Sequence, residues 1–423
     1  MMLLLLLLLI ALIMLSVPIF ISIGLSTTVA FLTSNLPLFM IPQKMFDGVN
    51  SYVLLAVPLF MLAGSFMDQG GMSKRLVEFS ESLVGHFRGG LAITSILSSM
   101  LFAGVSGSAA ADTAAVGSVL IPPMKKKGYD KNFAASIVAT GGSIGVIIPP
   151  SIPMIIFAFI ANVSVGKLFL AGIIPGTIIG LSLILLVIFK TRNLEIDHDN
   201  KNFDFSKFKS AFKDAILALG IPFIVVGGIL GGLFTATESA AVAVVYSFIV
   251  SKFIYKELTW VKVYKSTVYA INTSAIILII ISIATVFSWY LSMNNIQELL
   301  TKSFMLISHD KYILLIVINL FLLIMGTFVE TTAALILFVP VITPLLNNLG
   351  VDPLTYGVMI VTNLAIGMLT PPLGICLIVS GTIAKSKIFD ISKAIVPFLL
   401  VMIVDLLLIT FVPFLTTYLP SIY

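Results

Sequence analysis

Long apolar runs divided by short charged windows are the feature that most limits how this chain can fold. The runs at 165–189, 271–291 and 395–414 each reach the ~20 residues that a helix needs to cross the hydrocarbon core of a membrane. Only 10% of the 423 residues are charged, whereas about a quarter of an average soluble chain is charged. The sequence therefore predicts an all-α, polytopic membrane protein, and it excludes soluble enzymes and proteins that bind nucleic acid.

Cysteine and histidine are too rare for the usual metal and redox sites. Cys376 is the single cysteine and the three histidines are scattered, which excludes a disulfide framework, a CxxC site and a histidine-based metal cluster. An intramembrane enzyme is a weak interpretation, because no histidine falls in a predicted span and Cys376 has no histidine neighbour. We therefore expect no enzymatic activity and no organic cofactor.

The positions of the positive charges predict the topology. All but four of the 24 lysines and arginines fall into five windows. Because cytoplasmic loops carry an excess of lysine and arginine, these windows are expected on the cytoplasmic side and the other four lysines outside. The polar segment 191–213 is interpreted as a cytoplasmic linker between two halves of the chain. The windows are 74–88, 125–131, 190–213, 252–265 and 385–393, and the outside lysines are Lys44, Lys167, Lys302 and Lys311.

The segment 89–124 is predicted to be a re-entrant helical hairpin. Its neighbours Arg88 and Lys125 belong to cytoplasmic windows, so the segment must leave and return on one side. Its length is too short for two crossings of ~20 residues each with a turn between them. The sequence GVSGS at 104–108 breaks it in the middle. Such irregular backbone at membrane depth is tolerated only where it is buried in protein or lines a cavity.

A second hairpin with the same design is predicted at 312–346. An apolar run is followed by a polar break at Gly326-Thr327 and then by a second apolar run. The flanks of this segment are poor in cations. We therefore expect this hairpin to enter the membrane from the outside.

An internal repeat relates the two hairpins and the segments that follow them. The hairpin residues 108–124 align with 326–342, and after a further shift of four residues 128–150 aligns with 350–372, with seven of 23 positions identical. Each unit is a hairpin followed by a broken helix, and the charge bias of the flanks predicts inverted topology. Inverted repeats with discontinuous helices are typical of secondary transporters. The identical positions in the first unit are Gly128, Asp130, Thr140, Ile144, Gly145, Pro149 and Pro150.

These observations divide the chain into six parts. The N-terminal leucine-rich run has no obvious cleavage site, and we interpret it as a retained anchor made of one long broken span or two short ones. The expected parts are 1–88, N-terminal scaffold spans with an amphipathic segment; 89–190, a first repeat with the broken helix 132–164; 191–213, the linker; 214–311, central scaffold spans; 312–390, a second repeat with the broken helix 355–384; and 391–423, a C-terminal span.

The breaks in the two helices predict cation sites. A Gly-x-x-x-Pro-Pro stretch frees several backbone carbonyls at once, because proline removes a donor and clashes with the preceding turn. Unpaired carbonyls in hydrocarbon are costly, and a desolvated Na⁺ is a good partner for them. We therefore expect two or more Na⁺ ions; the alternative for each motif is a plain proline kink packed against a neighbour. The first ion is assigned to Ser106, Gly107, Gly145, Ile148 and Pro150, and the second to Gly326, Thr327, Gly367 and Thr370.

The space between the hairpin tips is predicted to bind an anion. Each helix that starts after a tip presents free N–H groups and the positive end of its dipole to this space. All three arginines, Arg75, Arg88 and Arg192, lie in cytoplasmic windows, so no arginine clamp is expected there. The expected substrate residues are Ser106, Ser108, Asp112, Thr140, Thr327, Glu330 and Thr362.

Acidic residues within spans are candidate functional residues, because a charge inside a membrane is costly. The alignment of the hairpins pairs Asp112 with Glu330, about one turn beyond each break. Both are expected either to cap the helix that follows or to stabilise the ion electrostatically. Glu238 has no partner in the repeat, and a buried helix-start residue is preferred over a proton relay.

Five long motifs spread over nearly the whole chain carry a resemblance to a known family. The motifs are VPLFMLAGSFMDQGG, GVSGSAAADTAAVGSVLIPPM, ATGGSIGVIIPPSIPMIIF, GGLFTATESAAVAV and TNLAIGMLTPPLGICL. In this order they resemble the large membrane (M) subunit of TRAP (tripartite ATP-independent periplasmic) transporters. In that family the hairpin tips and broken helices carry substrate and sodium, which transfers to the two regions assigned above.

The resemblance implies an elevator-type, Na⁺-driven importer of organic acids in the bacterial inner membrane. Known substrates of the family include C4-dicarboxylates and sialic acids. The implied partners are a periplasmic substrate-binding protein, a small four-helix (Q-type) membrane subunit and membrane lipid. The small subunit is expected as a separate chain, because this sequence shows no extra N-terminal four-helix block.

Two other transport functions remain open at this point. A stand-alone divalent-anion:sodium symporter shares the inverted hairpin plan but works without partner proteins. A passive channel is less consistent with the sequence, because selectivity-filter channels usually arrange one pore loop per subunit or repeat around a symmetric pore. Two hairpins inserted from opposite sides fit a moving carrier better.

Overall fold

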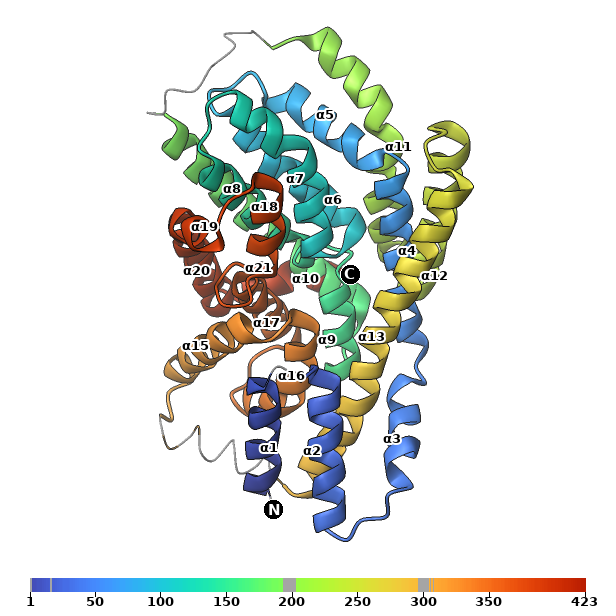
Figure 1. The fold of residues 1–423 in the computed structure, drawn as a ribbon, viewed down its shortest axis with the longest axis vertical. Coiled ribbons are helices and arrows are strands. Elements are labelled where there is room, and N and C mark those ends of the chain that lie inside the picture. Colours follow the sequence, from blue (N-terminus) through green and yellow to red (C-terminus); the bar gives the residue numbers. More distant parts are fainter. Residues whose placement is uncertain (1, 16, 193–202, 296–303, 305, 307) are drawn as a thin grey trace.

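Helices make up every regular element in the part of the chain that the structure describes (Figure 1). The structure is a computed structural model, and it describes all residues except 1, 16, 193–202, 296–303, 305 and 307. Seven of its helices are long and apolar enough to cross a membrane, or up to eight if a bent helix pair counts as one span. The prediction of an all-α polytopic membrane protein is therefore confirmed. The predicted linker 191–213 and the end of the predicted central spans lie partly outside the described residues.

The first half of the chain starts with two short helices instead of one long span. α1 and α2 are separated near Val17 and Pro18, and Pro18 precedes the first residue of α2. α3 follows at the far end of the molecule, and α4 then returns toward the centre (Figure 1). The helices of this half are α1 Met2–Met14, α2 Ile19–Thr33, α3 Met40–Val49, η1 Tyr52–Leu55, α4 Ala56–Gln69, α5 Met72–Val84, α6 Gly90–Ser106, α7 Ala109–Lys126, α8 Lys131–Ser143, η2 Ile144–Val146, α9 Ile152–Ala161 and α10 Val165–Thr191.

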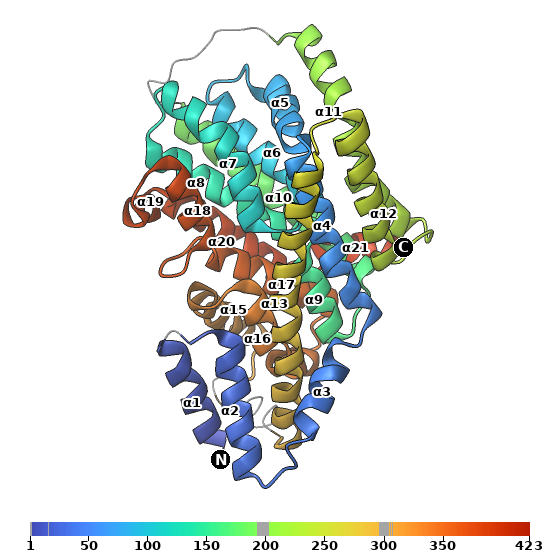
Figure 2. The ribbon, with the colours of Figure 1, turned by 45° about the vertical axis from the view of Figure 1, so that its right-hand side comes forward.

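The second half contains the longest helix, α13, which has 34 residues and runs along one side of the molecule (Figure 2). It packs against α2, α3 and α4 of the first half. The helices of this half are α11 Phe205–Leu230, α12 Ala236–Ile249, η3 Val250–Ile254, α13 Trp260–Met293, α15 Lys311–Phe328, α16 Thr331–Asn348, α17 Pro353–Gly367, α18 Ile375–Ala384, α19 Ile388–Ala394, α20 Val396–Phe411 and α21 Phe414–Ile422.

The helices repeat with one constant spacing of 222 residues. Ser108 occupies the N-cap position of α7 without a side-chain cap bond, and Glu330 caps α16, while Asp130 and Asp352 cap α8 and α17. The same spacing therefore relates both the hairpins and the broken helices, and the shift of four residues in the sequence alignment is wrong. The expected equivalence of Asp112 with Glu330 is wrong for the same reason: Asp112 lies one turn inside α7, at the place that alanine occupies in α16.

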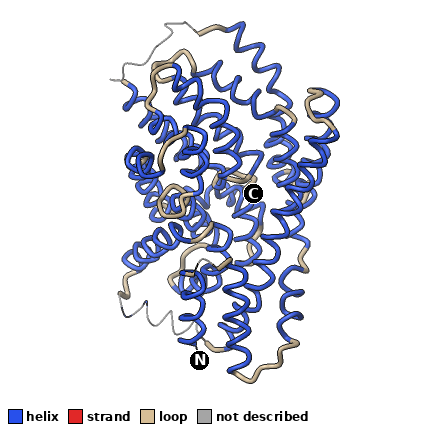
Figure 3. The backbone as a smooth tube through the Cα atoms, in the orientation of Figure 1, coloured by secondary structure: helices blue, strands red, loops and turns tan. Residues whose placement is uncertain are grey.

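The two repeat units interlock around the centre of the molecule. α7 and α8 of the first unit pack on α18 of the second, and α16 of the second unit packs on α9 of the first. Gly117 of α7 faces Val138 of α8 and Ile383 of α18, and Lys125 at the end of α7 donates to the Ala384 carbonyl of α18 at 3.2 Å. This packing brings both hairpin turns and both helix breaks to one place. Figure 3 shows loops between the helices near the middle of the molecule.

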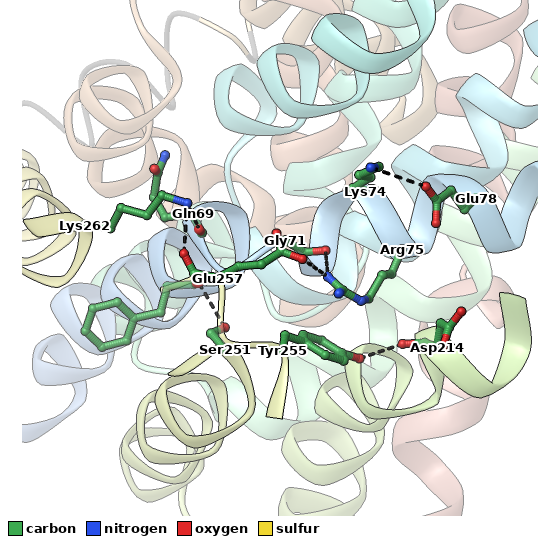
Figure 4. A network of polar contacts seen from close by, with 11 residues as sticks. Gln69, Gly71, Lys74, Arg75, Glu78, Asp214, Ser251, Tyr255, Glu257 and Lys262 are labelled. Carbon is green, nitrogen blue, oxygen red and sulfur yellow. Dashed lines mark hydrogen bonds and ion pairs between the residues drawn. The ribbon is translucent and has the colours of Figure 1, made fainter. Parts of the chain in front are cut away.

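A polar network fastens the turn between α4 and α5 to the start of α13 (Figure 4). Arg75 donates to Glu257 at 2.7 Å and to the Gly71 carbonyl at 2.8 Å, and its guanidinium lies 3.8 Å from the centre of the Tyr255 ring. Lys262 donates to the Gln69 carbonyl at 2.9 Å and to the Glu257 carbonyl at 3.0 Å. These contacts hold α5 and α13 at fixed positions beside the hairpin of the first unit.

Candidate transport site

The first hairpin turns at Gly107, which lies between the last residue of α6, Ser106, and the cap of α7, Ser108. Gly107 has φ +61°, which favours glycine because a side chain is strained there. A methyl group at this position would also lie 2.8 Å from the Pro150 carbonyl oxygen. The Ile152 N–H donates to the Gly107 carbonyl at 3.5 Å. The first tip therefore rests directly on the break between α8 and α9.

Asp112 is the acidic residue of this tip. Its side chain is fully buried, and one carboxylate oxygen accepts a hydrogen bond from Ser106 Oγ. The other oxygen has no hydrogen-bond partner among the described residues. It lies against Gly145, so close that a β-carbon there would overlap it. A buried carboxylate oxygen without a donor, next to a hydroxyl and irregular backbone, is a donor set that fits a desolvated Na⁺.

The first break itself contributes backbone oxygens unevenly. Pro150 directs its carbonyl toward Gly107, as the predicted site requires. The side chain of Ile148 packs against Gly176 of α10; its predicted role through the backbone carbonyl stays a prediction. Ser151 donates to the Val146 carbonyl at 2.6 Å and caps α9, so its hydroxyl is already used.

The second hairpin turns later than predicted. α15 continues through Gly326 and Thr327 to Phe328, and Val329 then leads to Glu330, the cap of α16. The polar break predicted at Gly326-Thr327 is therefore wrong. Thr327 Oγ1 donates to the Ile324 carbonyl at 2.8 Å, as hydroxyls within helices commonly do.

Gly326 lies in a close contact between two helices and does not form a turn. A methyl group on Gly367 of α17 would lie 2.6 Å from the Gly326 carbonyl carbon, so the two backbones touch. This contact closes the gap between the two glycines that the second predicted ion would need. The Leu373 N–H donates to the Thr327 carbonyl at 3.1 Å, which joins the second tip to the break between α17 and α18.

Glu330 is held as a helix cap. Its carboxylate accepts hydrogen bonds from the Thr332 N–H at 2.9 Å and the Ala333 N–H at 3.2 Å. The first turn of α16 is therefore already occupied by a negative charge. Nearby, Thr331 Oγ1 is buried without a partner among the described residues.

A cavity of about 450 Å³ lies between the two tips. Four helices begin at its wall, because its lining includes Ala109 of α7, Ile152 of α9, Thr331 of α16 and Ile375 of α18. No side chain caps α7 or α18. At α18 the Cys376 N–H donates to the Met368 carbonyl at 3.3 Å, so the first turn of α7 offers more N–H groups than that of α18. Glu330 is the one charged residue among the described lining residues. Any attraction of this wall for an anion therefore comes from helix dipoles and N–H groups and not from cations.

The four predicted threonines, Thr140, Thr327, Thr362 and Thr370, all lie outside the described lining of this cavity. Thr140 is buried in α8 and donates to the Ser136 carbonyl at 2.7 Å. Thr370 donates to the Ile366 carbonyl at 3.2 Å. Thr362 is buried in α17 with a hydroxyl that has no partner in the described part of the chain. The structure therefore brings Ser108 and Glu330 together at the cavity, and it places Ser106 beside Asp112 just behind it.

No sequence pattern predicts the wall opposite the tips. Met61 of α4 and Thr273 of α13 line the same cavity. Neither carries a sequence signal, because one methionine or threonine in an apolar helix is ordinary. Asp68 of α4, which lies in a neighbouring cavity with Ser106 and Ser108, had a signal as an acid in a predicted span.

Glu238 forms a capping box with Thr235. Thr235 Oγ1 accepts from the Glu238 N–H at 3.2 Å, and the Glu238 carboxylate accepts from the Thr235 N–H at 2.8 Å. This geometry supports the helix-start role. Contrary to the expected burial, the pair lies at an exposed turn.

A protein-family model matches the part of the chain that contains the tips and breaks described above. The model of the "Tripartite ATP-independent periplasmic transporter, DctM component" matches residues 6–415. The chain belongs to this family. Relatives of this DctM component include the C4-dicarboxylate TRAP transporter large permease protein DctM of Vibrio cholerae, 38% identical over 96% of this chain and 94% of that protein. The sialic acid TRAP transporter large permease protein SiaM of the same organism is 37% identical over 90% of this chain and 89% of that protein.

A third relative of the DctM component is longer. It is the isethionate TRAP transporter permease protein DctMQ of Oleidesulfovibrio alaskensis, 38% identical over 95% of this chain. The chain spans 63% of that protein's length.

A solved structure shares the fold. The YdaH transporter of Alcanivorax borkumensis, whose crystal structure is described as having an unusual topology, superposes with a TM-score of 0.64. The match covers 88% of this chain and 87% of that chain at 16% identity. At this identity the likeness shows the shared fold alone.

Proposed function

We propose that this DctM component imports a small organic acid across the bacterial inner membrane, driven by co-transported Na⁺. The observation that carries the proposal is the cavity between the tips, where four helices begin and two of them lack a side-chain cap. N–H groups at helix ends bind carboxylates, and a site without a fixed cation holds an anion loosely enough to release it. The relatives named for C4-dicarboxylates and sialic acid transport organic anions of this class.

The anion is placed at the starts of α7 and α18. The start of α16 is less suitable, since the Glu330 carboxylate occupies its N–H groups and repels a second anion. The hydroxyl of Ser108, which lines the cavity, supplies a further donor. In this placement the substrate is bound by Ser108 and by backbone groups near it, and not by the other residues expected from the sequence.

The first Na⁺ is placed at Asp112, Ser106 and the backbone of Gly145 and Pro150. Its support is the unpartnered oxygen of Asp112 and the room that Gly145 leaves beside it. A second ion would lie beside Thr370, not between Gly326 and Gly367, and its ligands would be neutral oxygens only. Sodium bound at Asp112 would stabilise the first tip against its helix break and so favour the closed site.

Transport is proposed to follow an elevator motion. The two interlocked units, which carry both tips, would move as one body against the wall formed by α4 and α13. A periplasmic substrate-binding protein would deliver the solute, and a small four-helix membrane subunit would complete the permease.

The test is uptake by proteoliposomes that contain this chain, the small subunit and the binding protein. Accumulation of the organic acid should require an inward Na⁺ gradient and should fail with an equal K⁺ gradient. Equal uptake in both gradients would contradict the coupling. Full uptake by this chain without its partners would instead favour the stand-alone symporter.

A further inference from the structure

A second cavity, here called the vestibule, begins at the first tip and leads away from the cavity between the tips. Both cavities are lined by Met61, Ser108 and Ile152, so they adjoin at the first tip. The vestibule has a volume of about 450 Å³. Its walls are defined by Asp68 and Gln69 of α4, Ala114 and Ser118 of α7, and Lys265 and Tyr269 of α13.

The vestibule reaches the surface beside the start of α13, where its lining residue Lys265 belongs to the cation-rich window 252–265. Asp68, Ser118, Lys265 and Tyr269 are all exposed. Lys252 belongs to the same window. The positive-inside bias assigns this window to the cytoplasm. The vestibule therefore extends from the first tip to exposed residues of α4, α7 and α13 beside this window.

The two walls of the vestibule differ in chemistry. The wall formed by α7 consists of the small residues Ala111, Ala114, Ala115 and Ser118 and carries no charge. The facing wall of α4 and α13 carries Asp68 and Lys265. The vestibule thus has one neutral wall and one wall with charged side chains.

Lys265 is the one cation among the described lining residues of either cavity. It has no hydrogen-bond or ion-pair partner in the part of the chain that the structure describes, whereas its neighbour Lys262 donates to two carbonyls (Figure 4). Arg75 at the same junction is paired with Glu257. The vestibule therefore holds one ammonium group that has no hydrogen-bond or ion-pair partner among the described residues.

Asp68, unlike Lys265, has hydrogen-bond partners. Its carboxylate accepts hydrogen bonds from Ser73 Oγ at 3.2 Å and Gln69 Nε2 at 3.3 Å. These donors reduce, but do not cancel, the repulsion that its charge exerts on an anion. The electrostatic potential in the vestibule thus depends on two opposite charges, the unpaired cation Lys265 and the hydrogen-bonded acid Asp68.

We propose that the vestibule is a cytoplasmic anion subsite in which Lys265 receives the carboxylate after it leaves the tips. The inference rests on the proposed import of an organic acid. An ammonium group at the mouth of a low-dielectric cleft raises the local concentration of an anion and speeds its passage. Tyr269 and Gln69 on the same wall supply polar groups for the remainder of the solute.

The first experiment measures the charge preference of the vestibule without transport. Ser118→Cys places a thiol on the neutral wall, while the native Cys376 is buried. The complete transporter in nanodiscs is labelled with an anionic and a cationic methanethiosulfonate reagent. Lys265→Gln should lower the ratio of the anionic to the cationic rate about fivefold. Asp68→Asn should raise this ratio.

The matched control is Lys209→Gln, which removes an exposed cation of α11 outside the vestibule lining. It should leave the ratio within about twofold of the starting protein, since exposed charges beyond a Debye length are screened. An unchanged ratio in Lys265→Gln, or an equal fall in the control, would overturn the subsite.

The second experiment measures exchange in proteoliposomes with succinate as the probe. Lys265→Gln should raise the succinate concentration needed for half-maximal exchange at the cytoplasmic face about fivefold, and should leave the value at the opposite face unchanged. An equal change at both faces, or none, would overturn the inference. Absence of Na⁺-driven uptake in the unaltered transporter would count against the proposed function, while the labelling ratio would still decide the charge of the vestibule.

Discussion

The free carboxylate oxygen of Asp112 lies against the α-carbon of Gly145, so that the acid of the first hairpin contacts the break of the first discontinuous helix. Ser106 holds the other oxygen. These three residues come from three different elements, α6, α7 and η2. A cation bound there would link all three elements, which is how ion binding can organise a transport site.

Replacing Gly145 by alanine should close the space beside Asp112. The added methyl group would overlap the free oxygen, and overpacking of this kind costs about 1–3 kcal/mol. We expect the Na⁺ concentration for half-maximal uptake to rise about tenfold. The control is Gly227→Ala, because a methyl group at Gly227 meets nothing within 4 Å. Equal Na⁺ dependence in both variants would contradict the assignment.

Asp112→Asn should weaken Na⁺ binding more than Ser106→Ala does. The first change removes a buried charge that faces the ion, at about 2–5 kcal/mol, and the second removes one neutral ligand, at about 1 kcal/mol. The readout is the Na⁺ dependence of uptake.

The control for this pair is Asp405→Asn. Asp405 is also a buried acid that accepts from a serine, Ser182 at 2.5 Å, but it lies on α20 and lines neither described cavity. Its substitution should leave the Na⁺ dependence unchanged. If Asp405→Asn and Asp112→Asn shift it equally, the effect reports general stability and not ion binding.

Gly367→Ala should destabilise the protein through the second tip. The new methyl group would lie 2.6 Å from the Gly326 carbonyl carbon, and the helices α15 and α17 must separate to admit it. We expect a loss of about 1–3 kcal/mol, seen as a lower melting temperature of the detergent-solubilised protein. Gly24→Ala is the comparison, since its nearest neighbour would be 3.6 Å away. A Gly367→Ala protein as stable as the Gly24→Ala protein would show that this crossing is loose.

Glu330→Gln separates the capping role of this residue from its charge. Glutamine keeps an oxygen for the Thr332 and Ala333 N–H groups but removes the negative charge from the cavity wall. Substrate affinity should therefore be equal or tighter, while Glu330→Ala should lose about 0.5–2 kcal/mol of stability with the cap. A large loss of substrate affinity in Glu330→Gln would mean that the carboxylate binds the solute or its ion.

The apolar runs and the proline pairs predicted the helical class and the two breaks, because these signals are local. The register of the repeat was harder to predict. Glycine at 326 resembles a turn residue in sequence, yet it serves a contact with Gly367, which is distant in the chain. Aligning that glycine with the first tip displaced the second hairpin by four residues and paired Asp112 with Glu330, although the constant spacing places an alanine there.

The candidate site was predicted only where the sequence breaks a helix. Ser106, Gly107 and Gly145 could be named because irregular backbone is rare in apolar segments. Met61 and Thr273 could not be named, since their role depends on α4 and α13 facing the tips across the cavity. In the sequence, Lys265 indicates only that its loop lies on the cytoplasmic side. Its position in the vestibule depends on the packing of α13.

The most direct test of Na⁺-driven import counts both solutes in the same vesicles. Proteoliposomes with the complete transporter would receive radioactive Na⁺ and a differently labelled organic acid, without any other gradient. The account predicts that the acid and Na⁺ enter together, and that Asp112→Asn reduces both. Accumulation of the acid with no accompanying Na⁺ would contradict it.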